Sequence, residues 1–229
     1  MKGKATKIFI LLTIGISISP SQTKYPADTI LVSKNTSLIK KLGVLPIAGW
    51  QRISYNSDFF NCQFEPSCSN YGAQSIHKHG LILGAFMASD RVIRCNPAAF
   101  QYHLKSGGKY NQLNKKIVDP IQPNFKQMNN HSKAFLSAGL SALVPGLGRA
   151  YTGSWIDGLL GFTLFYLTAN TGYKAYQDNL PIKAPLFIGA AFIIYGGEIF
   201  GAYRSANNNS LTNNTTSLRV ISISASISA

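Results

Sequence analysis

The chain has 229 residues, of which 22 are Lys or Arg and 8 are Asp or Glu, so its formal net charge at pH 7 is +14. Residues 1–133 carry 17 Lys or Arg against 5 Asp or Glu, whereas residues 134–229 carry 5 against 3. A basic part joined to an apolar part favours an anionic membrane surface as partner. Aromatic residues are not interleaved with the basic ones, which argues against nucleic acid, and three cysteines exclude a disulfide scaffold.

The N-terminus, residues 1–22, has the pattern of a secretory signal peptide or an uncleaved anchor. A basic stretch is followed by an apolar core over residues 8–18, which is too short to cross a bilayer as a helix. The sequence leaves cleavage open.

A basic amphipathic stretch follows at residues 38–54. It combines apolar residues with Lys40, Lys41, Arg52 and Trp50. This composition suits a segment that lies at a membrane interface. Two glycines and a proline interrupt it, so we expect a kinked segment, with an ordinary exposed connector as the alternative.

Residues 62–71 read Cys-Gln-Phe-Glu-Pro-Ser-Cys-Ser-Asn-Tyr, residues 79–80 read His-Gly, and residues 91–97 read Arg-Val-Ile-Arg-Cys-Asn-Pro. Ser69 is the expected N-cap of a helix that ends near His79, and Gly80 is its expected left-handed C-cap. A second helix is expected from Leu81 to about Arg94.

These residues resemble the YidD family of bacterial membrane protein insertion efficiency factors. The family pattern is Cys-Arg-Phe-x-Pro-Thr/Ser-Cys-Ser-x-Tyr, then His-Gly, then Arg-x-x-Arg-Cys-x-Pro, and the resemblance covers about residues 45–103. Gln63 stands where the family has an arginine, which removes one positive charge. The matching positions are Cys62, Phe64, Pro66, Cys68, Ser69, Tyr71, His79, Gly80, Arg91, Arg94, Cys95 and Pro97.

A metal site among the cysteines and histidines is not expected. Cys62 and Cys68 lack the two-to-four-residue spacing of a zinc knuckle, and His77 and His79 would point to different sides of a helix. Buried thiols, or a Cys62–Cys68 bridge in an oxidising compartment, remain open. No cofactor is expected, and without an orienting third group beside a Cys–His pair the chain is not expected to be an enzyme.

The rest of the chain divides into a basic linker (104–133), a two-helix membrane domain (134–205) and a low-complexity tail (206–229). Residues 134–148 predict a half-helix broken by Pro145-Gly146, and residues 158–173 and 184–203 predict two spans, of which the second has the required length of about 20 residues. Residues 145–153 and 195–203 resemble small two-helix membrane domains. Gly197 and Gly201 are expected to pack against the first span. The tail predicts a short strand or disorder.

The expected fold is therefore mainly α, with a small helical, Cys-containing module (38–103) on the membrane surface and a C-terminal transmembrane helical hairpin. Basic residues around the hairpin place the module on the cytoplasmic face of the bacterial inner membrane, whereas a cleaved signal peptide would place it outside.

The resemblance implies an accessory role in inserting integral membrane proteins, near the Sec translocon, the YidC insertase and nascent membrane proteins. The alternatives are an envelope structural or interaction protein without insertion activity, and a small metal or redox protein. The residues expected to bind the membrane or a partner are Lys40, Lys41, Trp50, Arg52, Lys78, Arg91 and Arg94.

Overall fold

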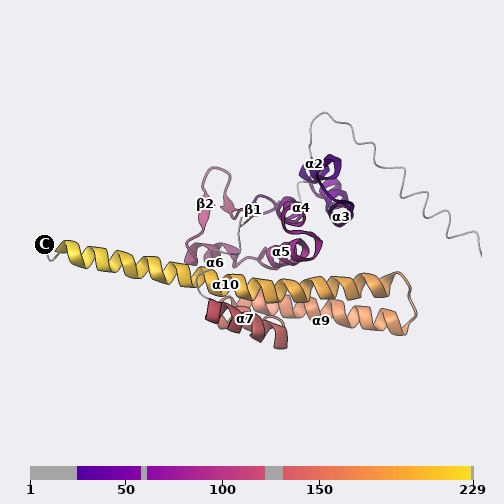
Figure 1. Cartoon of the computed structure of the whole chain (residues 1–229). Helices are drawn as coiled ribbons and strands as arrows, with labels where there is room; N and C mark the ends of the chain where they lie inside the picture. The colour runs from indigo at the N-terminus through magenta and orange to yellow at the C-terminus, as the bar shows by residue number, and fades with distance from the viewer. Residues whose placement is uncertain (1–24, 58–60, 122–130, 228–229) are drawn as a thin grey trace, which may run out of the picture.

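The protein consists of a small module packed against a long helical hairpin, as Figure 1 shows for the computed structural model, which describes residues 25–57, 61–121 and 131–227. The predicted signal peptide or anchor at residues 1–22 lies outside the described residues. The elements are α2 (Pro26–Val32), α3 (Leu38–Ser54), β1 (Phe64–Glu65), α4 (Cys68–His79), α5 (Leu81–Ile93), α6 (Ala99–Lys105), β2 (Lys109–Asn111), β3 (Lys116–Val118), α7 (His131–Leu143), α8 (Leu147–Tyr151), α9 (Trp155–Gln177) and α10 (Lys183–Ile227).

The centre of the module is the pair α4 and α5, on which α2 and α3 pack. Gly84 allows the two central helices to approach closely, because a side chain there would meet the backbone of Ser75 and Ile76. Gln51 joins α2 to α3, since its Oε1 accepts a hydrogen bond of 3.0 Å from the backbone N–H of Ala27. The apolar core consists of Ala27, Ile30, Val44, Ala48, Ala73 and Ile76.

The helix α3 is continuous over Leu38–Ser54, so the prediction that its two glycines and its proline break up a continuous helix is wrong. Pro46 lies inside it on the exposed side, while Val44 and Ala48 anchor the opposite side in the core. Because elongating a helix is easier than starting one, this packing outweighs the local cost of the proline.

The start of α4 also differs from the prediction. Its N-cap is Ser67, whose Oγ accepts a 3.4 Å hydrogen bond from the N–H of Asn70, and Ser69 already lies inside the helix. The Oγ of Ser69 instead accepts from Nε2 of Gln51. Gly80 ends α4 as predicted, with φ of 89°, but its ψ of 172° places it outside the left-handed helical region, so the chain leaves in an extended conformation.

A three-stranded sheet in the order β1-β3-β2 closes the module. Phe64 of β1 pairs in parallel with Ile117 of β3, and Tyr110 of β2 pairs with the same residue in the antiparallel sense. Phe64, Ala99 and Ile117 form a second small core. The predicted linker at 104–133 therefore contributes two strands to the module, because Ile117 is buried against a residue 53 positions earlier; residues 122–130 lie outside the described part.

The C-terminal part is a hairpin of α9 and α10, with α7 and α8 packed on its side (Figure 1). The predicted break at Pro145-Gly146 is present between α7 and α8, where Gly146 has φ of 88°. Within the described residues, one helical stretch, Lys183–Asn207, is long and apolar enough to cross a membrane, with a mean hydropathy of 1.5.

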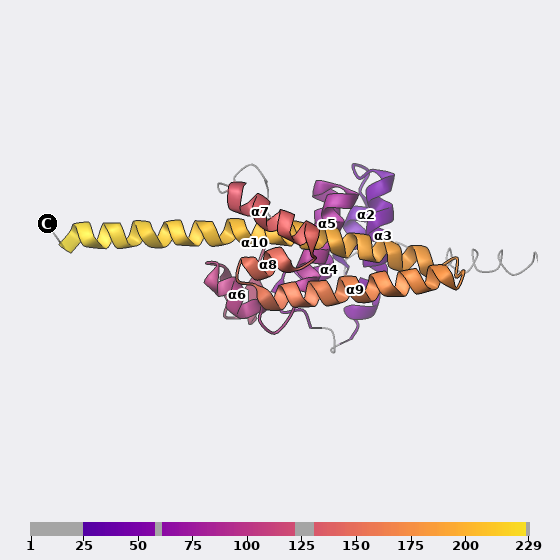
Figure 2. The same ribbon diagram turned by 90° about the horizontal axis from the view of Figure 1, so that it is seen from below.

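The helix α5 lies along α10. Figure 2 shows this arrangement from below. A side chain at Gly197 would meet Ser89 Cβ at 2.7 Å, and one at Gly201 would meet Arg149 and Asp90. The prediction that these two glycines pack against the first span is therefore wrong. They instead form the surface that receives α5, and α9 approaches α10 at Gly161, close to Glu198.

The helix α10 continues to Ile227 and so includes most of the predicted tail. The structure thus has a helix where the sequence predicts a strand or disorder. A polar segment can be helical when it extends a helix that has already formed, since no new nucleus is required.

Candidate functional site

The motif between residues 62 and 97 folds around one buried guanidinium, that of Arg91. Its Cζ lies 4.0 Å from the ring centroid of Phe64 and 4.6 Å from that of Tyr71. Its nitrogens donate to the carbonyl of Pro66 at 3.1 Å and to Asp119 Oδ2 at 2.6 Å. Stacking and charge-assisted hydrogen bonds at one group explain why these residue types occur together.

A second cluster joins the module to the hairpin through Asp90 of α5. Its Oδ2 lies 3.1 Å from Nε of Arg94 and 2.9 Å from Nε of Arg204, and its Oδ1 lies 2.7 Å from an amino nitrogen of Arg149. Arg149 in turn contacts Glu198 at 3.0 Å. Asp90, Arg149 and Glu198 have no exposed surface, so residues from α5, α8 and α10 form one enclosed ionic network.

Each arginine of this region contacts at least one carboxylate, which permits its burial. Burial alone would raise the pKa of Asp119, but the guanidinium groups of Arg94 and Arg91 lower it to about 2. Burial likewise acts to raise the pKa of Asp90, and Arg204, Arg94 and Arg149 together hold it below its usual range. Both carboxylates therefore stay ionised above about pH 4. The charged residues of this region are the buried Arg91, Arg94, Arg149, Asp90, Asp157 and Glu198 and the partly exposed Arg204 and Asp119.

Arg91 and Arg94 do not lie where a lipid phosphate could reach them. Arg91 is fully buried and Arg94 is 8% exposed, and both are paired with carboxylates. Their prediction as membrane-binding residues is corrected accordingly. They neutralise acidic residues inside the module. The sequence could not indicate this role, because a spacing of three residues shows only that the two arginines are neighbours on a helix.

We expect Arg91→Lys to lower the free energy of unfolding by about 2–4 kcal/mol, because an ammonium cannot stack between two rings while donating to two partners. Chemical unfolding of the full chain in detergent measures this. Arg52→Lys is the matched control, since Arg52 forms a partly exposed pair with Asp28 and should change by about 1 kcal/mol or less. Equal losses in both variants would contradict the assignment.

The most distinctive surface feature is an apolar face on α3. Its members recur at the helical spacing of three and four residues and occupy one side of the helix, opposite Val44, Ala48 and Gln51. Leu38 is 72% exposed and Ile53 is 62% exposed, although large apolar side chains are usually buried. We call this surface the α3 apolar face; it consists of Leu38, Ile39, Leu42, Leu45, Pro46, Trp50 and Ile53.

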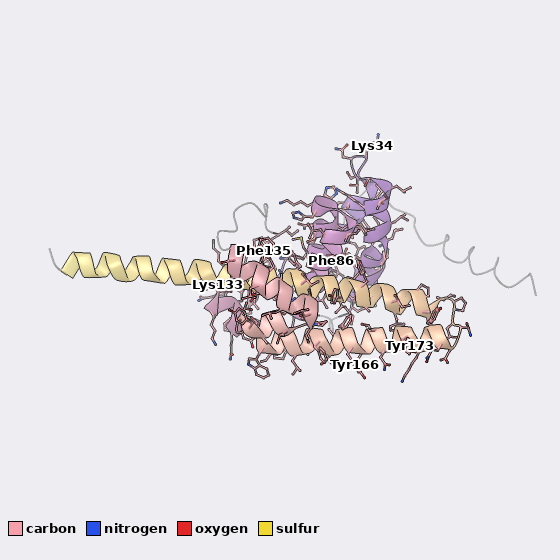
Figure 3. All side chains as sticks on the ribbon, turned by 60° about the horizontal axis from the view of Figure 1, so that its bottom comes forward. Lys34, Phe86, Lys133, Phe135, Tyr166 and Tyr173 are labelled. Carbon is pink, nitrogen blue, oxygen red and sulfur yellow. The ribbon has the colours of Figure 1, made fainter. Side chains whose placement is uncertain are left out.

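The α3 apolar face continues toward the hairpin. Ile39 lines a shallow hollow together with Ile82 and Phe86 from α5. Phe86 then meets Phe192 of α10, with ring centroids 5.6 Å apart. Figure 3 shows Phe86 where the module meets α10, and Tyr166 on the side of α9 turned away from the module. A contiguous apolar surface of this kind marks an interaction site.

The predicted basic residues lie around this face at different depths. Lys41 and Arg52 lie along its edge, at spacings of four and seven from Leu45, and Lys78 is exposed at the end of α4. Lys40 donates to the carbonyl of His77 at 2.7 Å. Arg52 contacts Asp28 at 3.1 Å, so part of its charge is already neutralised.

The three cysteines converge, although Cys95 lies 27 residues beyond Cys68 in the sequence. The sulfur atoms of Cys62, Cys68 and Cys95 all lie within 4.8 Å of one another, and the first two are 3.4 Å apart. Gln63, the departure from the family pattern, donates to Cys95 Sγ at 3.6 Å and to the carbonyl of Asn96 at 3.1 Å. Among the remaining motif residues, His79 and Gly80 form the junction of α4 and α5, and Pro97 lies exposed before α6.

Sequence reasoning missed the acidic partners of the arginines. Asp119 lies in the predicted linker, and Glu198 is an isolated acid in an apolar span. Asn96 also joins the two parts, because its Nδ2 donates to Asp157 Oδ1 of α9 at 2.6 Å. A charged residue within a predicted span was the one signal available, since such residues need a partner.

The described residues form a helical protein with one stretch long and apolar enough to cross a membrane and with an exposed apolar face on α3. A sequence model of the YidD family, described as "Putative membrane protein insertion efficiency factor", matches residues 39–103. A relative of the same description from Colwellia psychrerythraea is 36% identical over 92 residues, which cover 40% of this chain and 94% of the relative. One from Thermotoga maritima is 42% identical over 87 residues, which cover 38% of this chain and 89% of the relative. No solved structure matches the chain.

The chain belongs to the YidD family. The family's description supports a role related to membrane protein insertion and gives no indication of an enzyme. The matched region ends before β2, so β2, β3, α7, α8 and the hairpin lie beyond it, whereas β1 lies within it.

Proposed function

We propose that the protein is an accessory factor for the insertion of integral membrane proteins, held at an anionic membrane by the α3 apolar face and by the hairpin of α9 and α10. The observation that carries this proposal is the α3 apolar face. Five of its side chains are more than 45% exposed, namely Leu38, Ile39, Leu42, Trp50 and Ile53. Exposing this much contiguous apolar surface to water is unfavourable, whereas the interface of a bilayer accepts it.

The orientation of α3 supports this placement. In Figures 1 and 2, α3 runs across the direction of the hairpin, on the side of the module nearer to the hairpin turn. A hairpin that crosses a bilayer would therefore hold α3 parallel to the membrane plane. This is the orientation in which an amphipathic helix buries its apolar side in the interface.

The hairpin turn favours a full crossing. Lys174, Asp178 and Lys183 flank it, and charges at the centre of a bilayer cost several kcal/mol. The stretch Lys183–Asn207 has 25 residues, or roughly 37 Å of helix, against a hydrocarbon core of about 30 Å. The contacts of α5 with α10 extend from Phe192 to Arg204, within this stretch. In a full crossing, the part of the module that packs on α10 therefore lies in the leaflet on the module's side of the membrane. The charged residues between α5 and α10 remain enclosed by protein there.

The basic charge of the module supports a cytoplasmic orientation at the inner membrane. In this position, Lys41, Lys78 and the less accessible Lys40 and Arg52 contact lipid phosphates, and Trp50 lies among the headgroups. The exposed apolar surface would contact transmembrane segments as they leave the Sec translocon or the YidC insertase.

We expect Leu42→Glu to lift α3 out of the interface while the hairpin keeps the chain inserted, because the change removes apolar area from the contact and adds a negative charge. The chain has two tryptophans, so in a Trp155→Phe background the fluorescence of Trp50 reports on α3. Brominated lipid in anionic vesicles should quench Trp50 in the reconstituted full chain, and should quench it at least about twofold less in Leu42→Glu. Leu113→Glu is the matched control, since Leu113 is 98% exposed in the turn between β2 and β3, away from α3. Equal quenching in Leu42→Glu, Leu113→Glu and the unsubstituted background would exclude the α3 apolar face as the contact.

The function itself is tested in cells that lack the gene. The rate at which a reporter inner-membrane protein becomes protease-protected is measured while the insertase is limiting. We expect the wild type and Leu113→Glu to restore the rate and Leu42→Glu to fail. An unchanged rate in the deletion strain would overturn the proposal, and crosslinking of the chain to itself alone would favour an envelope structural protein.

A further inference from the structure

A compact group of thiols has no role in the proposed function; it consists of Cys62, Cys68 and Cys95. The chain reverses between β1 and α4, which brings Cys62 beside Cys68, and the segment directly after α5 supplies Cys95. Their sulfur atoms lie within 4.8 Å of one another. The Cys-x5-Cys spacing is not that of a zinc knuckle, but the reversal of the chain nevertheless brings the sulfur atoms of Cys62 and Cys68 close together.

The spacing of the three sulfur atoms fits ligation of one ion. At a metal–sulfur distance of about 2.3 Å, sulfur atoms around one ion are separated by roughly 3.8 Å in a tetrahedron and 4.0 Å in a plane. Cys62 and Cys68 are 3.4 Å apart, and both pairs that include Cys95 lie within 4.8 Å. Shifts of less than about 1 Å would therefore bring all three into ligating geometry.

Hydrogen-bond donors reach two of the three sulfur atoms. The backbone N–H of Cys68 donates to Cys62 Sγ at 3.3 Å, and Gln63 donates to Cys95 Sγ at 3.6 Å. Cys68 is the first residue of α4, where the helix dipole favours negative charge. Cys62 and Cys68 also pack on the core formed by Phe64, Ala99 and Ile117, which holds them in place.

The sulfur cluster is accessible from solvent. It lines a cleft of about 820 Å³ between the end of α3 and the start of α4, together with Tyr55, Asn61 and Lys116. No histidine or carboxylate among the described residues joins the three thiols in the cluster. A water molecule from the cleft can complete a tetrahedral zinc site, whereas copper(I) is satisfied by three thiolates.

We propose that Cys62, Cys68 and Cys95 bind one thiophilic closed-shell cation, zinc(II) or copper(I), as three thiolates. Each thiol releases its proton to solvent as its sulfur binds the ion, and no electron is transferred. The bound ion links three segments: the residues before β1, the first residue of α4 and the residues after α5. This inference is independent of the insertion role.

The test uses the full chain, reduced and stripped with a chelator in detergent. It is titrated with cobalt(II), then with zinc(II) to displace the cobalt, and separately with copper(I) against a chromophoric competitor. We expect one equivalent, a near-ultraviolet cobalt–thiolate charge-transfer band, and a higher melting temperature with the ion. Cys95→Ser should bind at least 100-fold more weakly. Asn61→Ala, in the same cleft but without a sulfur ligand, should bind within threefold of the wild type.

Several results would overturn this proposal. They are the absence of the charge-transfer band together with no copper(I) uptake, or equal affinity in Cys95→Ser. A Cys62–Cys68 disulfide in protein alkylated at the moment of lysis would also exclude it and assign the pair to an oxidised bridge. Because Cys95 is exposed, Cys95→Ser should keep the circular dichroism of the metal-free wild type, which separates lost ligation from lost folding.

Discussion

Replacing Asp90 by alanine should lower the free energy of unfolding by about 3–5 kcal/mol, because it leaves buried guanidinium groups without their shared carboxylate. Asp90 lies within 3.1 Å of Arg94 directly after α5, of Arg149 in α8 and of Arg204 in α10. Its loss affects the contact between the module and the hairpin as well as the module itself. Chemical or thermal unfolding of the full chain in detergent measures the change.

Two further variants separate charge from general damage. Asp90→Asn keeps the size and one acceptor but removes the charge, so we expect most of the same loss. Asp28→Ala removes the carboxylate of the partly exposed pair with Arg52 and should cost about 1 kcal/mol or less. Comparable stability of Asp90→Ala and Asp28→Ala would show that the ionic network does not hold the two parts together.

The sequence predicts those features of the module that depend on local signals. The junction of α4 and α5 at Gly80 and the stop near Pro97 follow from residues that restrict the backbone where they stand. The amphipathic character of residues 38–54 is likewise visible in the spacing of its leucines and isoleucines. The continuity of α3 is not, because the core contacts of Val44 and Ala48 decide it.

The ionic network and the cysteine cluster depend on contacts between distant segments. Arg204 and Asp90 are 114 positions apart, and Cys62 and Cys95 are separated by two helices. A spacing rule for zinc knuckles does not anticipate this convergence, and a rule that arginines lie on surfaces does not anticipate Arg91. Strands of three residues in a polar linker give no periodic signal of their own.

Gly84→Ala should destabilise the module by about 3 kcal/mol, because a β-carbon at this position would lie 2.6 Å from the carbonyl carbon of Ser75 and closer still to the backbone of Ile76. No flexible side chain can move aside to accommodate it, so α4 and α5 must separate. Thermal unfolding followed by circular dichroism measures the loss.

Gly49→Ala is the matched control, since Gly49 also lies within a helix but has nothing within 4 Å of its added β-carbon. Alanine favours helix over glycine, so this variant should be about 0.5–1 kcal/mol more stable than the wild type. The same substitution should therefore destabilise the protein at position 84 and stabilise it at position 49. This difference separates the effect of the close contact between α4 and α5 from the effect of helix propensity. If Gly84→Ala were also stabilising, the two helices would have to be farther apart than the structure places them, and the positions of Arg91 and Asp90 on α5 would change with them.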